Sequence, residues 1–375
     1  MKVLIITGEI SGDLYASLLV KRIREINPAL HFIGIGGPKL RGTDTEILFS
    51  AESLSLIGIP KPSDLKKYYF IYKKIEDLLR KRKVDLVILV DFPGFNLKIA
   101  KLAKSLNYPV IYYVAPQVWA WHKKRIRILK KYVDLLLVIL PFEENFFKSY
   151  GLPVKYLGHP AVDVVKVNLS QDLFYEMYGI KNRGPIISFF PGSREGEVTR
   201  HLPLFLKVYK ELKKKNPEIF GIIGKAPGLK ETTLWENAKK EMLVLENMSY
   251  EILKYSHASL LASGTITLEA ALLETPAVVT YSLPPWIYFI AKRLVKVPFI
   301  SLPNLILGRE VYPEILQDKC SPLELASALE RVIKGETEIK NALKEIKTLL
   351  GSPGVTWKIA EEINKFVHNL KYHRP

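Results

Sequence analysis

Cysteine is nearly absent from this chain of 375 residues, because Cys320 is the only one. A single cysteine excludes an intrachain disulfide and argues against a zinc site built on thiolates. The sequence also lacks any apolar run of the roughly 20 residues that a helix needs to cross a bilayer. The apolar start at residues 2–8 is too short for a signal-peptide core and predicts a buried first strand. We therefore expect a protein of the reducing cytoplasm that does not span a membrane.

Several common metal and nucleotide motifs are missing as well. No DxD, HExxH or CxxC pattern occurs, so we expect neither a metal ion nor a bound cofactor. The dinucleotide fingerprint GxGxxG and the P-loop GxxxxGK[ST] are absent from the glycine turns discussed below. The charge of a bound diphosphate would then be neutralised by helix N-termini and basic side chains.

Positive charge, by contrast, is abundant, and the formal net charge is +17 at pH 7. Such a charge favours an anionic partner, which could be a nucleic acid, a phosphorylated metabolite or an anionic lipid, although a merely solvated basic surface is the simpler alternative. Residues 123–131 contain six Lys or Arg among nine, directly after Trp119 and Trp121. Because the basic residues are spread over the chain and no recognised nucleic-acid-binding module is present, binding of nucleic acid is only a distant alternative.

Short apolar runs alternate with amphipathic stretches over nearly the whole chain, lapse at 161–184 and then restart. Continuously apolar runs are typical of parallel strands that are covered on both faces. We expect an α/β protein with two Rossmann-like, doubly wound parallel-sheet domains facing a cleft, at 1–165 and 166–350, and a C-terminal helix at 351–375 that crosses back to the first domain. The expected strands are 2–8, 31–37, 84–91, 110–116, 134–140 and 154–160, then 185–193, 219–225, 258–263 and 276–282, and helices are expected at 12–27, 63–82, 96–106 and 119–131.

Two motifs that follow strands of the first half carry acids. TGEISGD (7–13) places Glu9 at a strand end, and Ser11 is able to cap the next helix. VDFPGFN (90–96) places Asp91 at the end of a very apolar strand, where burial would raise the pKa of its carboxyl toward that of a general base. Asn96 would cap the following helix. The alternative for both motifs is a capped turn with nothing bound.

In the second half, FFPGSREGEV (189–198) again joins a strand to a helix through a glycine turn. Gly192 and Ser193 offer backbone N–H groups and a hydroxyl, and Arg194 offers a planar fork for phosphate oxygens. The pattern predicts a phosphate-binding turn, with an ordinary helix start as the alternative.

A further strand and helix meet at LLASGTITLEAA (260–271). Ser263, Gly264 and Thr265 would open the helix and form a second phosphate-binding turn. Glu269 follows one helical turn after Thr265, where its carboxylate would accept hydrogen bonds from a ribose diol. Phosphate and ribose binding in one segment is typical of a nucleotide-sugar enzyme.

Taken in order, these motifs resemble those of the lipid-A-disaccharide synthases. The resemblance runs from residue 8 to about 320 and is weakest over 161–184 and after about 321. It depends on GEISGD (8–13), GIGGPKL (34–40), DFPGFN (91–96), APQVWAWHKKR (115–125), LPFE (140–143), GHP (158–160), PGSREGE (191–197), ASGTITLEAAL (262–272) and AKRLVKVPFISLPNLILGRE (291–310).

The resemblance implies a GT-B fold and an inverting glycosyltransferase. The donor would be UDP-2,3-diacylglucosamine and the acceptor 2,3-diacylglucosamine 1-phosphate, joined by a β-1,6 bond with release of UDP. A UDP-N-acetylglucosamine 2-epimerase or another GT-B nucleotide-sugar enzyme is the alternative.

The resemblance also assigns residues to roles. Asp91 or Glu9 would be the general base, since this chain has Gly94 where some family members carry a second acid. Acceptor binding is expected from Ser11, Asn96, Gln117 and Trp121, and UDP binding from Gly192, Ser193, Arg194, Ser263, Gly264, Thr265, Glu269 and Asn304.

Acylated substrates imply contact with a membrane surface, at the cytoplasmic face of the inner membrane. The stretch 56–75 has apolar residues among lysines that suit this contact, namely Ile57, Ile59, Tyr69 and Phe70. A surface helix packed on its sheet is the alternative, and 286–296 is a second candidate for the contact. An oligomer is compatible with the sequence.

The basic stretch after Trp119 is read as one helix over 119–131. At helical spacing Trp119, Ile126 and Leu129 share one stripe, which predicts core packing for Trp119. Trp121 then lies on the opposite, basic face and is the residue expected to meet lipid headgroups.

Overall fold

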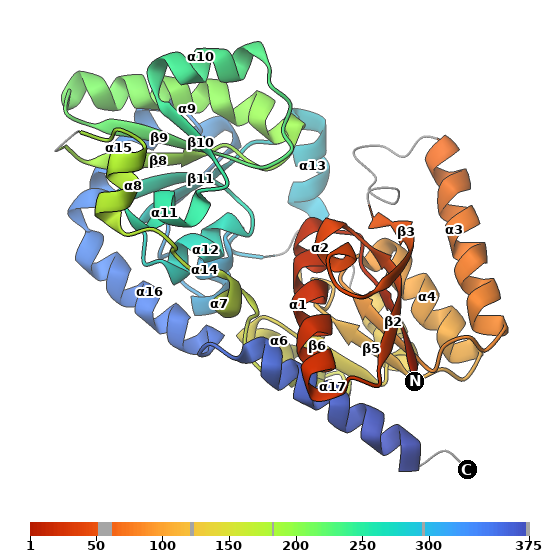
Figure 1. Cartoon of the computed structure of the whole chain (residues 1–375). Coiled ribbons are helices and arrows are strands. Elements are labelled where there is room, and N and C mark those ends of the chain that lie inside the picture. The colour runs from red at the N-terminus through yellow and green to blue at the C-terminus, as the bar shows by residue number, and fades with distance from the viewer. Residues whose placement is uncertain (52–61, 121–123, 182–183, 295–296, 373–375) are drawn as a thin grey trace. The chain divides into compact units, whose positions relative to one another are not determined.

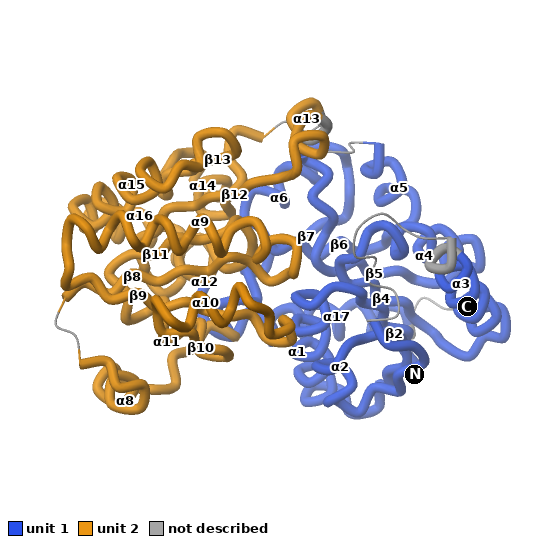
Figure 2. The backbone as a smooth tube through the Cα atoms, turned by 90° about the horizontal axis from the view of Figure 1, so that it is seen from above, with its two compact units in different colours: residues 1–163, 351–375 blue, residues 164–350 orange. Residues whose placement is uncertain are grey.

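The computed structural model describes residues 1–51, 62–120, 124–181, 184–294 and 297–372 of the chain. These residues form two compact units, drawn in two colours in Figure 2. Unit 1 comprises Met1–Asp163 and Gly351–Pro375, and unit 2 comprises Val164–Leu350. Each unit contains one parallel sheet flanked by helices, so the predicted α/β class with two parallel sheets is confirmed.

The sheet of unit 1 has seven parallel strands. Their runs of Val, Ile and Leu are buried along their length, as expected for strands covered on both faces. In spatial order the strands are β3 (Glu46–Ser50), β2 (His31–Gly36), β1 (Lys2–Ile6), β4 (Leu86–Val90), β5 (Val110–Tyr113), β6 (Leu135–Val138) and β7 (Val154–Tyr156).

Helices cover both faces of this sheet (Figure 1). Alternate residues of each strand enter two separate hydrophobic clusters: Leu4 and Ile6 face one cluster, whereas Val3 and Ile5 face the other. The first cluster is closed by α3 (Pro62–Arg80), α4 (Pro93–Ser105), α5 (Arg125–Tyr132) and α6 (Pro141–Lys148), and the second by α1 (Ile10–Ile26), α2 (Pro38–Arg41) and α17 (Val355–Tyr372). The short helix α7 (Ala161–Val164) ends the first pass of the chain through unit 1.

Unit 2 repeats the plan with a six-stranded parallel sheet. Its strands in spatial order are β10 (Leu243–Glu246), β9 (Phe220–Lys225), β8 (Ile186–Phe190), β11 (Ala258–Ala262), β12 (Ala277–Tyr281) and β13 (Glu314–Leu316). Its helices are α8 (Gln171–Met177), α9 (Glu195–Lys215), α10 (Thr233–Glu241), α11 (Ser249–Lys254), α12 (Ile266–Leu272), α13 (Pro285–Leu294), α14 (Leu302–Leu307), α15 (Pro322–Lys334) and α16 (Glu336–Leu350). Helices α9, α10 and α15 close a hydrophobic cluster on one face of this sheet.

Two features of the fold differ from the sequence prediction. Three strands were not predicted: β3, β10 and β13, which lie at edges of the two sheets and each contain a glutamate. The predicted helix at 119–131 is shorter, because α5 begins only at Arg125. The chain at residues 117–120 forms a turn instead, closed by the N–H of Ala120 donating to the carbonyl of Gln117.

Candidate active site

The two acids predicted for the first half lie at the carboxyl edge of the sheet in unit 1. Glu9 follows β1 and Asp91 follows β4, and these two strands are neighbours in parallel register, with Ile6 opposite Leu89. Asp91 (φ 49°) and Phe92 (φ 51°) are both in the left-handed region, which residues with a side chain rarely adopt. Two successive left-handed residues store strain, and such strain is common where a side chain must be held in a set direction.

The environment of Asp91 changes the acidity of its carboxyl. Burial in a poorly solvated position is the main cause that raises its pKa, the charge of Glu9 raises it further, and a hydrogen bond from the N–H of Phe92 partly opposes both, giving a pKa of about 6. Glu9 itself is exposed. The pair therefore combines a poorly solvated acid, mostly ionised at pH 7 but more basic than an ordinary carboxylate, with an exposed acid, an arrangement suited to taking up a proton near neutral pH.

Asn96 supports the turn that carries Asp91. Its side chain has no exposed surface, and its Nδ2 donates to the carbonyl oxygens of Ile6 (3.3 Å), Val90 (3.2 Å) and Asp91 (2.8 Å). Its predicted helix cap is wrong, because Phe92 occupies the N-cap of α4, whereas its predicted role in acceptor binding stays a prediction. Asn96 ties the ends of β1 and β4 together.

Asp13, the last residue of GEISGD, also has a structural role. Its buried carboxylate accepts the backbone N–H groups of Gly37 (2.7 Å), Lys39 (2.8 Å) and Leu40 (3.2 Å) at the start of α2. Gly37 has no room for a side chain, since a Cβ there would lie 2.7 Å from the carboxylate oxygen. The contact explains why GEISGD and GIGGPKL occur together: the acid of one satisfies the free N–H groups of the other.

The other residues predicted for the acceptor lie on the same edge or outside the described residues. Ser11 is half-buried in the first turn of α1, and Gln117 is exposed in the turn after β5. Trp121 lies outside the described residues. The prediction for Trp119 is corrected in part: it is partly buried, but its ring packs edge-on against Phe142 at 5.0 Å, on α6 and not in a stripe of α5.

In unit 2, the turn between β8 and α9 presents three predicted residues. Gly192 has φ 123°, which favours glycine, and a Cβ there would lie 2.5 Å from the Cβ of Glu197. The buried Glu197 accepts the N–H of Ser193 (3.0 Å) and an N–H of Arg194 (3.2 Å), and it also accepts the hydroxyl of Tyr281 (3.1 Å). The Arg194 side chain is 67% exposed, so its remaining N–H groups point to solvent and are able to receive an anion.

His201 holds this turn against the neighbouring strand. Its Nδ1 lies 2.9 Å from the carbonyl of Pro191, and its Nε2 accepts the N–H of Ser282 at 3.1 Å, after β12. Burial is the main cause that lowers the pKa of His201, which favours the neutral ring that these two bonds require. The glycine turn is therefore fixed from both sides before any ligand binds.

The start of α12 forms the second predicted turn. Gly264 and Thr265 are exposed, whereas the Ser263 hydroxyl donates to the carbonyl of Ile300 at 3.1 Å. One helical turn later, burial raises the pKa of Glu269 to about 7. Among the described residues, the Glu269 carboxylate has no hydrogen-bond or ion-pair partner. A desolvated carboxylate without a protein partner is a candidate acceptor for ligand hydroxyls.

Asn304 is enclosed in unit 2, and its predicted contact with UDP stays a prediction. It has no exposed surface, its Nδ2 donates to Tyr312 and Glu314 at 2.8 Å each, and its Oδ1 accepts the N–H groups of Val311 (2.8 Å) and Tyr312 (2.9 Å). With its amide fully bonded, Asn304 fixes the loop before β13.

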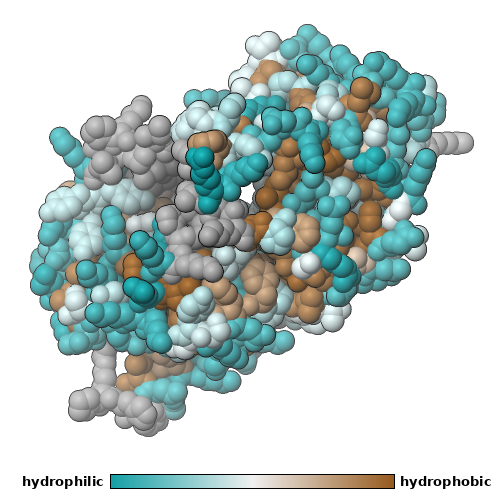
Figure 3. Space-filling model, turned by 180° about the vertical axis from the view of Figure 1, so that it is seen from behind, coloured by the Kyte–Doolittle hydropathy of each residue, from teal (hydrophilic) through white to brown (hydrophobic). Residues whose placement is uncertain are grey.

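The residues predicted to meet a membrane are divided between described and undescribed parts of the chain. Tyr69 and Phe70 on α3 are 63% and 53% exposed, whereas Ile57 and Ile59 lie outside the described residues. On the face of the molecule in Figure 3, hydrophilic side chains are interspersed with exposed hydrophobic ones. Within the described part of the chain, no helix combines the length and apolarity that crossing a bilayer requires.

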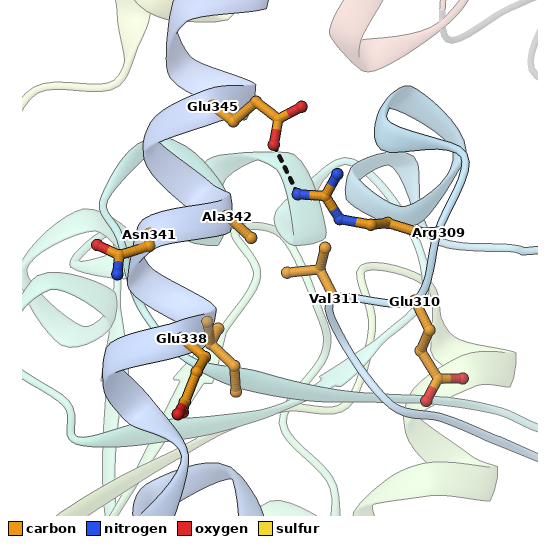
Figure 4. A pocket seen from close by; sticks show the side chains of 8 residues that line it. Arg309, Glu310, Val311, Glu338, Asn341, Ala342 and Glu345 are labelled. Atoms are coloured by element: carbon orange, nitrogen blue, oxygen red, sulfur yellow. Dashed lines mark hydrogen bonds and ion pairs between the residues drawn. The ribbon is translucent and has the colours of Figure 1, made fainter.

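A hollow of about 500 Å³ in unit 2 contains none of the predicted site residues (Figure 4). It lies between the segment that precedes β13 and helix α16, and Arg309 in its wall is bound to Glu345 at 2.6 Å. No cluster of three or more metal-ligating side chains was found among the described residues. The chemistry suggested by the geometry therefore remains at the carboxyl edges of the two sheets.

Comparison with known proteins identifies the family of the chain. The sequence profile of the family described as Lipid-A-disaccharide synthetase matches residues 3–362. The chain belongs to this family. Among curated relatives, the lipid-A-disaccharide synthase of Myxococcus xanthus is 36% identical over 369 residues and that of Trichlorobacter lovleyi 35% over 368 residues, with 96% of each chain covered in both cases. That of Persephonella marina is 36% identical, covering 97% of this chain and 98% of its own.

As a member of the lipid-A-disaccharide synthetase family, the chain is a glycosyltransferase of lipid A biosynthesis. Solved structures support the fold. The UDP-GlcNAc 2-epimerase from Neisseria meningitidis bound to UDP-GlcNAc has a TM-score of 0.69 at 14% identity, covering 97% of this chain and all of that one. The calicheamicin glycosyltransferase CalG4 has a TM-score of 0.63 at 13% identity, covering 98% of both chains. At these identities the likeness shows only the shared fold, which is the GT-B fold.

Sequence reasoning missed the residues that hold the family's motifs in place. Asp13 and His201 each bond backbone groups of a separate segment, whereas Glu197 and Glu143 of LPFE each bond a side chain of one, Tyr281 and Trp119 respectively. Each lies within or beside a motif that was quoted, but the motif alone does not reveal its partner. A buried acid or histidine next to a glycine turn is the signal that could have indicated them.

Proposed function

We propose that this enzyme transfers the sugar of UDP-2,3-diacylglucosamine to the 6-hydroxyl of 2,3-diacylglucosamine 1-phosphate. The products are the β-1,6-linked disaccharide 1-phosphate and UDP. The observation that carries the proposal is Asp91, a poorly solvated carboxyl with a pKa of about 6 at the carboxyl edge of unit 1. It is the group best able to remove a proton from a sugar hydroxyl near neutral pH.

The reaction requires one proton transfer and one displacement. As Asp91 takes the proton of the acceptor hydroxyl, the oxygen forms a bond to C1 of the donor sugar. The bond between C1 and the diphosphate oxygen breaks, and its electron pair leaves with UDP. Attack from the face opposite the diphosphate inverts the configuration at C1. Glu9, whose charge helps to raise the pKa of Asp91, is the second candidate for the base.

Unit 2 would hold UDP. The exposed Arg194 and the N–H groups of Gly192 and Ser193 would bind the diphosphate and stabilise the charge that develops on it. Gly264 and Thr265 at the start of α12 would add a second set of hydrogen-bond donors for the diphosphate. The Glu269 carboxylate would accept hydrogen bonds from the ribose hydroxyls. The Ser263 hydroxyl, already bonded to Ile300, would contribute through the position of its backbone.

The acceptor would be held in unit 1 by Ser11, Gln117 and Trp121, beside Asp91. Ser11 and Gln117 are polar side chains with exposed surface at the edge of the sheet where Asp91 lies, which supports this assignment.

The proposal is tested by incubating the enzyme with both lipid substrates and measuring disaccharide 1-phosphate and UDP. We expect equal amounts of the two products. Asp91→Asn should lower kcat by about 10²-fold to 10⁴-fold while the Kd for UDP changes less than about twofold, because only the proton transfer is removed. Turnover retained in Asp91→Asn would move the base to Glu9.

The epimerase alternative is favoured only by the fold likeness to UDP-GlcNAc 2-epimerases. Incubation with UDP-N-acetylglucosamine alone separates the two functions. Epimerisation of this sugar without any lipid acceptor would replace the transferase proposal.

We further propose that the enzyme contacts the cytoplasmic face of the inner membrane through α3. Lys73 Nζ lies 5.7 Å from the centre of the exposed Tyr69 ring, and Lys74 Nζ lies 5.4 Å from that of Phe70. Aromatic rings flanked by ammonium groups suit a surface of acyl chains and anionic headgroups. On α13, the exposed Phe289 has the Arg293 guanidinium 3.7 Å from its ring centre, which makes this helix the second candidate.

Flotation with vesicles that contain phosphatidylglycerol tests this contact. The paired change Tyr69→Ser and Phe70→Ser should reduce vesicle binding, whereas Leu173→Ser and Met177→Ser on α8 should not. The control side chains are also exposed, but Asp172 and Glu176 accompany them and would oppose an anionic surface. Unchanged flotation of the α3 variant would remove α3 from the contact.

A further inference from the structure

Glu143 is a buried carboxylate of unit 1 that the proposed reaction does not use. It lies in the first turn of α6 and is 1% exposed. Its Oε2 accepts the N–H groups of Leu140 (3.0 Å) and Ile139 (3.3 Å), and its Oε1 accepts the indole Nε1–H of Trp119 at 2.9 Å. Enclosing a carboxylate costs several kcal/mol unless hydrogen bonds compensate for the lost water. Among the described residues, the only side chain that donates a hydrogen bond to Glu143 is Trp119 of another segment, and such a pairing is unusual for an acid that serves packing alone.

The bond to Trp119 extends from α6 to the turn that follows β5. In that turn, the N–H of Val118 donates to Pro116 (2.7 Å) and the N–H of Ala120 donates to Gln117 (3.2 Å). Both contacts of Trp119, the bond to Glu143 and the edge-on packing against Phe142, are made to α6. The position of the turn at 115–120 is thus determined by α6 as well as by its own strand.

This turn begins beside Asp91. The N–H of Asp91 donates to the carbonyl of Tyr113 at the end of β5 (3.0 Å), and the N–H of Val114 donates to Leu137 of β6 (3.0 Å). Val114 has φ 60°, which is strained for a β-branched residue and directs the chain sharply out of the strand. Three adjacent strands therefore bring Asp91, the turn at 115–120 and Glu143 to one edge of the sheet.

Charge provides a second link between the two acids. Burial is the main cause that raises the pKa of Glu143 to about 7, its hydrogen bonds lower it, and the charge of Asp91 raises it. Burial raises the pKa of Tyr156 on β7, and the charge of Glu143 raises it further.

We propose that Glu143 is a positioning residue for the acceptor: its carboxylate holds the Trp119 indole and thereby fixes the turn that presents Gln117 beside Asp91. The proposal rests on the proposed function, because it assumes that the acceptor binds at this edge. Glu143 is enclosed, so it acts through Trp119 and does not contact the substrate.

Two substitutions break the same bond from opposite ends. Glu143→Gln leaves a side chain of equal size with only one accepting oxygen, so it cannot serve both the indole and the backbone N–H groups. Trp119→Phe removes the indole N–H but keeps a ring against Phe142. Each change should raise the KM for the acceptor by about tenfold to a hundredfold, a range expected when a positioning contact is lost. The Kd for UDP should stay within about twofold, since unit 2 is untouched.

The double variant decides whether the two residues act as one unit. We expect Glu143→Gln combined with Trp119→Phe to be no worse than the more damaging single change. Glu251→Gln is the matched control, because Glu251 is a buried acid of unit 2 that accepts the N–H of Asn168 at 2.8 Å. It should leave the acceptor KM unchanged.

A readout independent of turnover separates failure of this proposal from failure of the proposed function. Trp119→Phe identifies the Trp119 indole signal in ¹⁵N spectra, and Glu143→Gln should increase the exchange of that indole N–H with water. Unaltered exchange, additive effects in the double variant, or a loss of thermal stability without a change in acceptor KM would overturn the proposal. The wild type could fail to glycosylate the acceptor while the indole exchange responds as expected. In that case the hydrogen bond between Glu143 and Trp119 is supported and the proposed function fails.

Discussion

At the scale of single residues, the candidate site depends on acids with different surroundings. Asp91 has a raised pKa because it is poorly solvated and close to Glu9. Asp13, four residues after Glu9 in the sequence, has a buried carboxylate that accepts three backbone N–H groups. An aspartate is thus suited to proton transfer at position 91 and to holding backbone N–H groups at position 13.

The pKa of Asp91 predicts how activity depends on pH. A general base must be ionised, so kcat/KM should rise with pH and level off above about 6. A pH–rate profile with saturating UDP-sugar measures this limb. If the limb lies near pH 4, the carboxyl is solvated in the working enzyme and the assignment of its environment is contradicted.

The same shift predicts a change in stability. Because the pKa of Asp91 is higher in the folded chain than its ordinary value of 3.8, its stabilising contribution is complete below pH 4 and is lost as the pH rises through about 6. Asp91→Asn should therefore increase the free energy of unfolding at pH 7, by at most about 3 kcal/mol, and have little effect at pH 4. Asparagine also tolerates the left-handed backbone at this position. Asp13→Asn should instead destabilise the chain, because the Asp13 carboxylate accepts three backbone N–H groups, and urea unfolding compares the two variants.

Glu269 offers a prediction for UDP binding. Its carboxyl has a pKa of about 7, and only the ionised form accepts two hydroxyl hydrogen bonds. The affinity for UDP should thus increase as the pH rises through 7, by roughly tenfold or more if the charged bonds form. Because the phosphate of UDP also titrates, the measured quantity is the difference between wild type and Glu269→Gln in calorimetry. Parallel pH dependence of the two proteins would exclude Glu269 from the ribose site.

At the scale of elements, α17 completes unit 1. It packs along α1 (Figure 1), the Asn27 and Asn364 side chains are hydrogen-bonded at 2.9 Å, and Ile359 and Ile363 are buried in the second hydrophobic cluster of unit 1. At its start, the Asp163 carboxylate accepts the N–H groups of Gly354 and Thr356 at 2.6 and 2.7 Å. Helix α17 is therefore part of the core of unit 1.

Ile363→Ala tests this packing. Removing a fully buried isoleucine should lower the free energy of unfolding by about 2–5 kcal/mol. The exposed Lys365 on the same helix provides the matched control, and Lys365→Ala should change stability by less than about 0.5 kcal/mol. UDP binding should be unaffected by either change. An Ile363 variant as stable as wild type would show that α17 contributes little to unit 1.

At the scale of the whole molecule, the chain leaves unit 1 near residue 163, builds unit 2 and returns at 351. The acceptor residues proposed above lie in unit 1, and the UDP residues all lie in unit 2. Under the proposed function, substrate recognition would therefore be divided between the two units.

This division predicts a selective effect of UDP on stability. At a UDP concentration of about 100 times Kd, unit 2 should gain about 2.7 kcal/mol, because UDP binds only its folded form. Hydrogen exchange should become slower in residues 164–350 and remain unchanged in 1–163. Arg194→Gln should reduce the effect, and equal protection of both units would contradict a UDP site confined to unit 2.

Much of the fold was predictable because its signals are local. Continuous apolar runs such as 86–90 indicated parallel strands, and the lapse at 161–184 indicated a second domain. The edge strands β3, β10 and β13 were missed because each is only partly buried and contains a glutamate, so its apolar run is short. The start of α5 was misplaced because helical spacing alone does not show where a helix begins.

The site was predictable to the level of motifs but not of single roles. The ordered motifs by themselves determined the family, since each is a contiguous stretch that a sequence displays directly. Only the tertiary structure decided that Asn96 and Asn304 are enclosed and that Glu143 holds Trp119. Burial and hydrogen-bond partners depend on which distant segments the sheets bring together, and a side chain of given chemistry binds a ligand or supports the chain according to those neighbours.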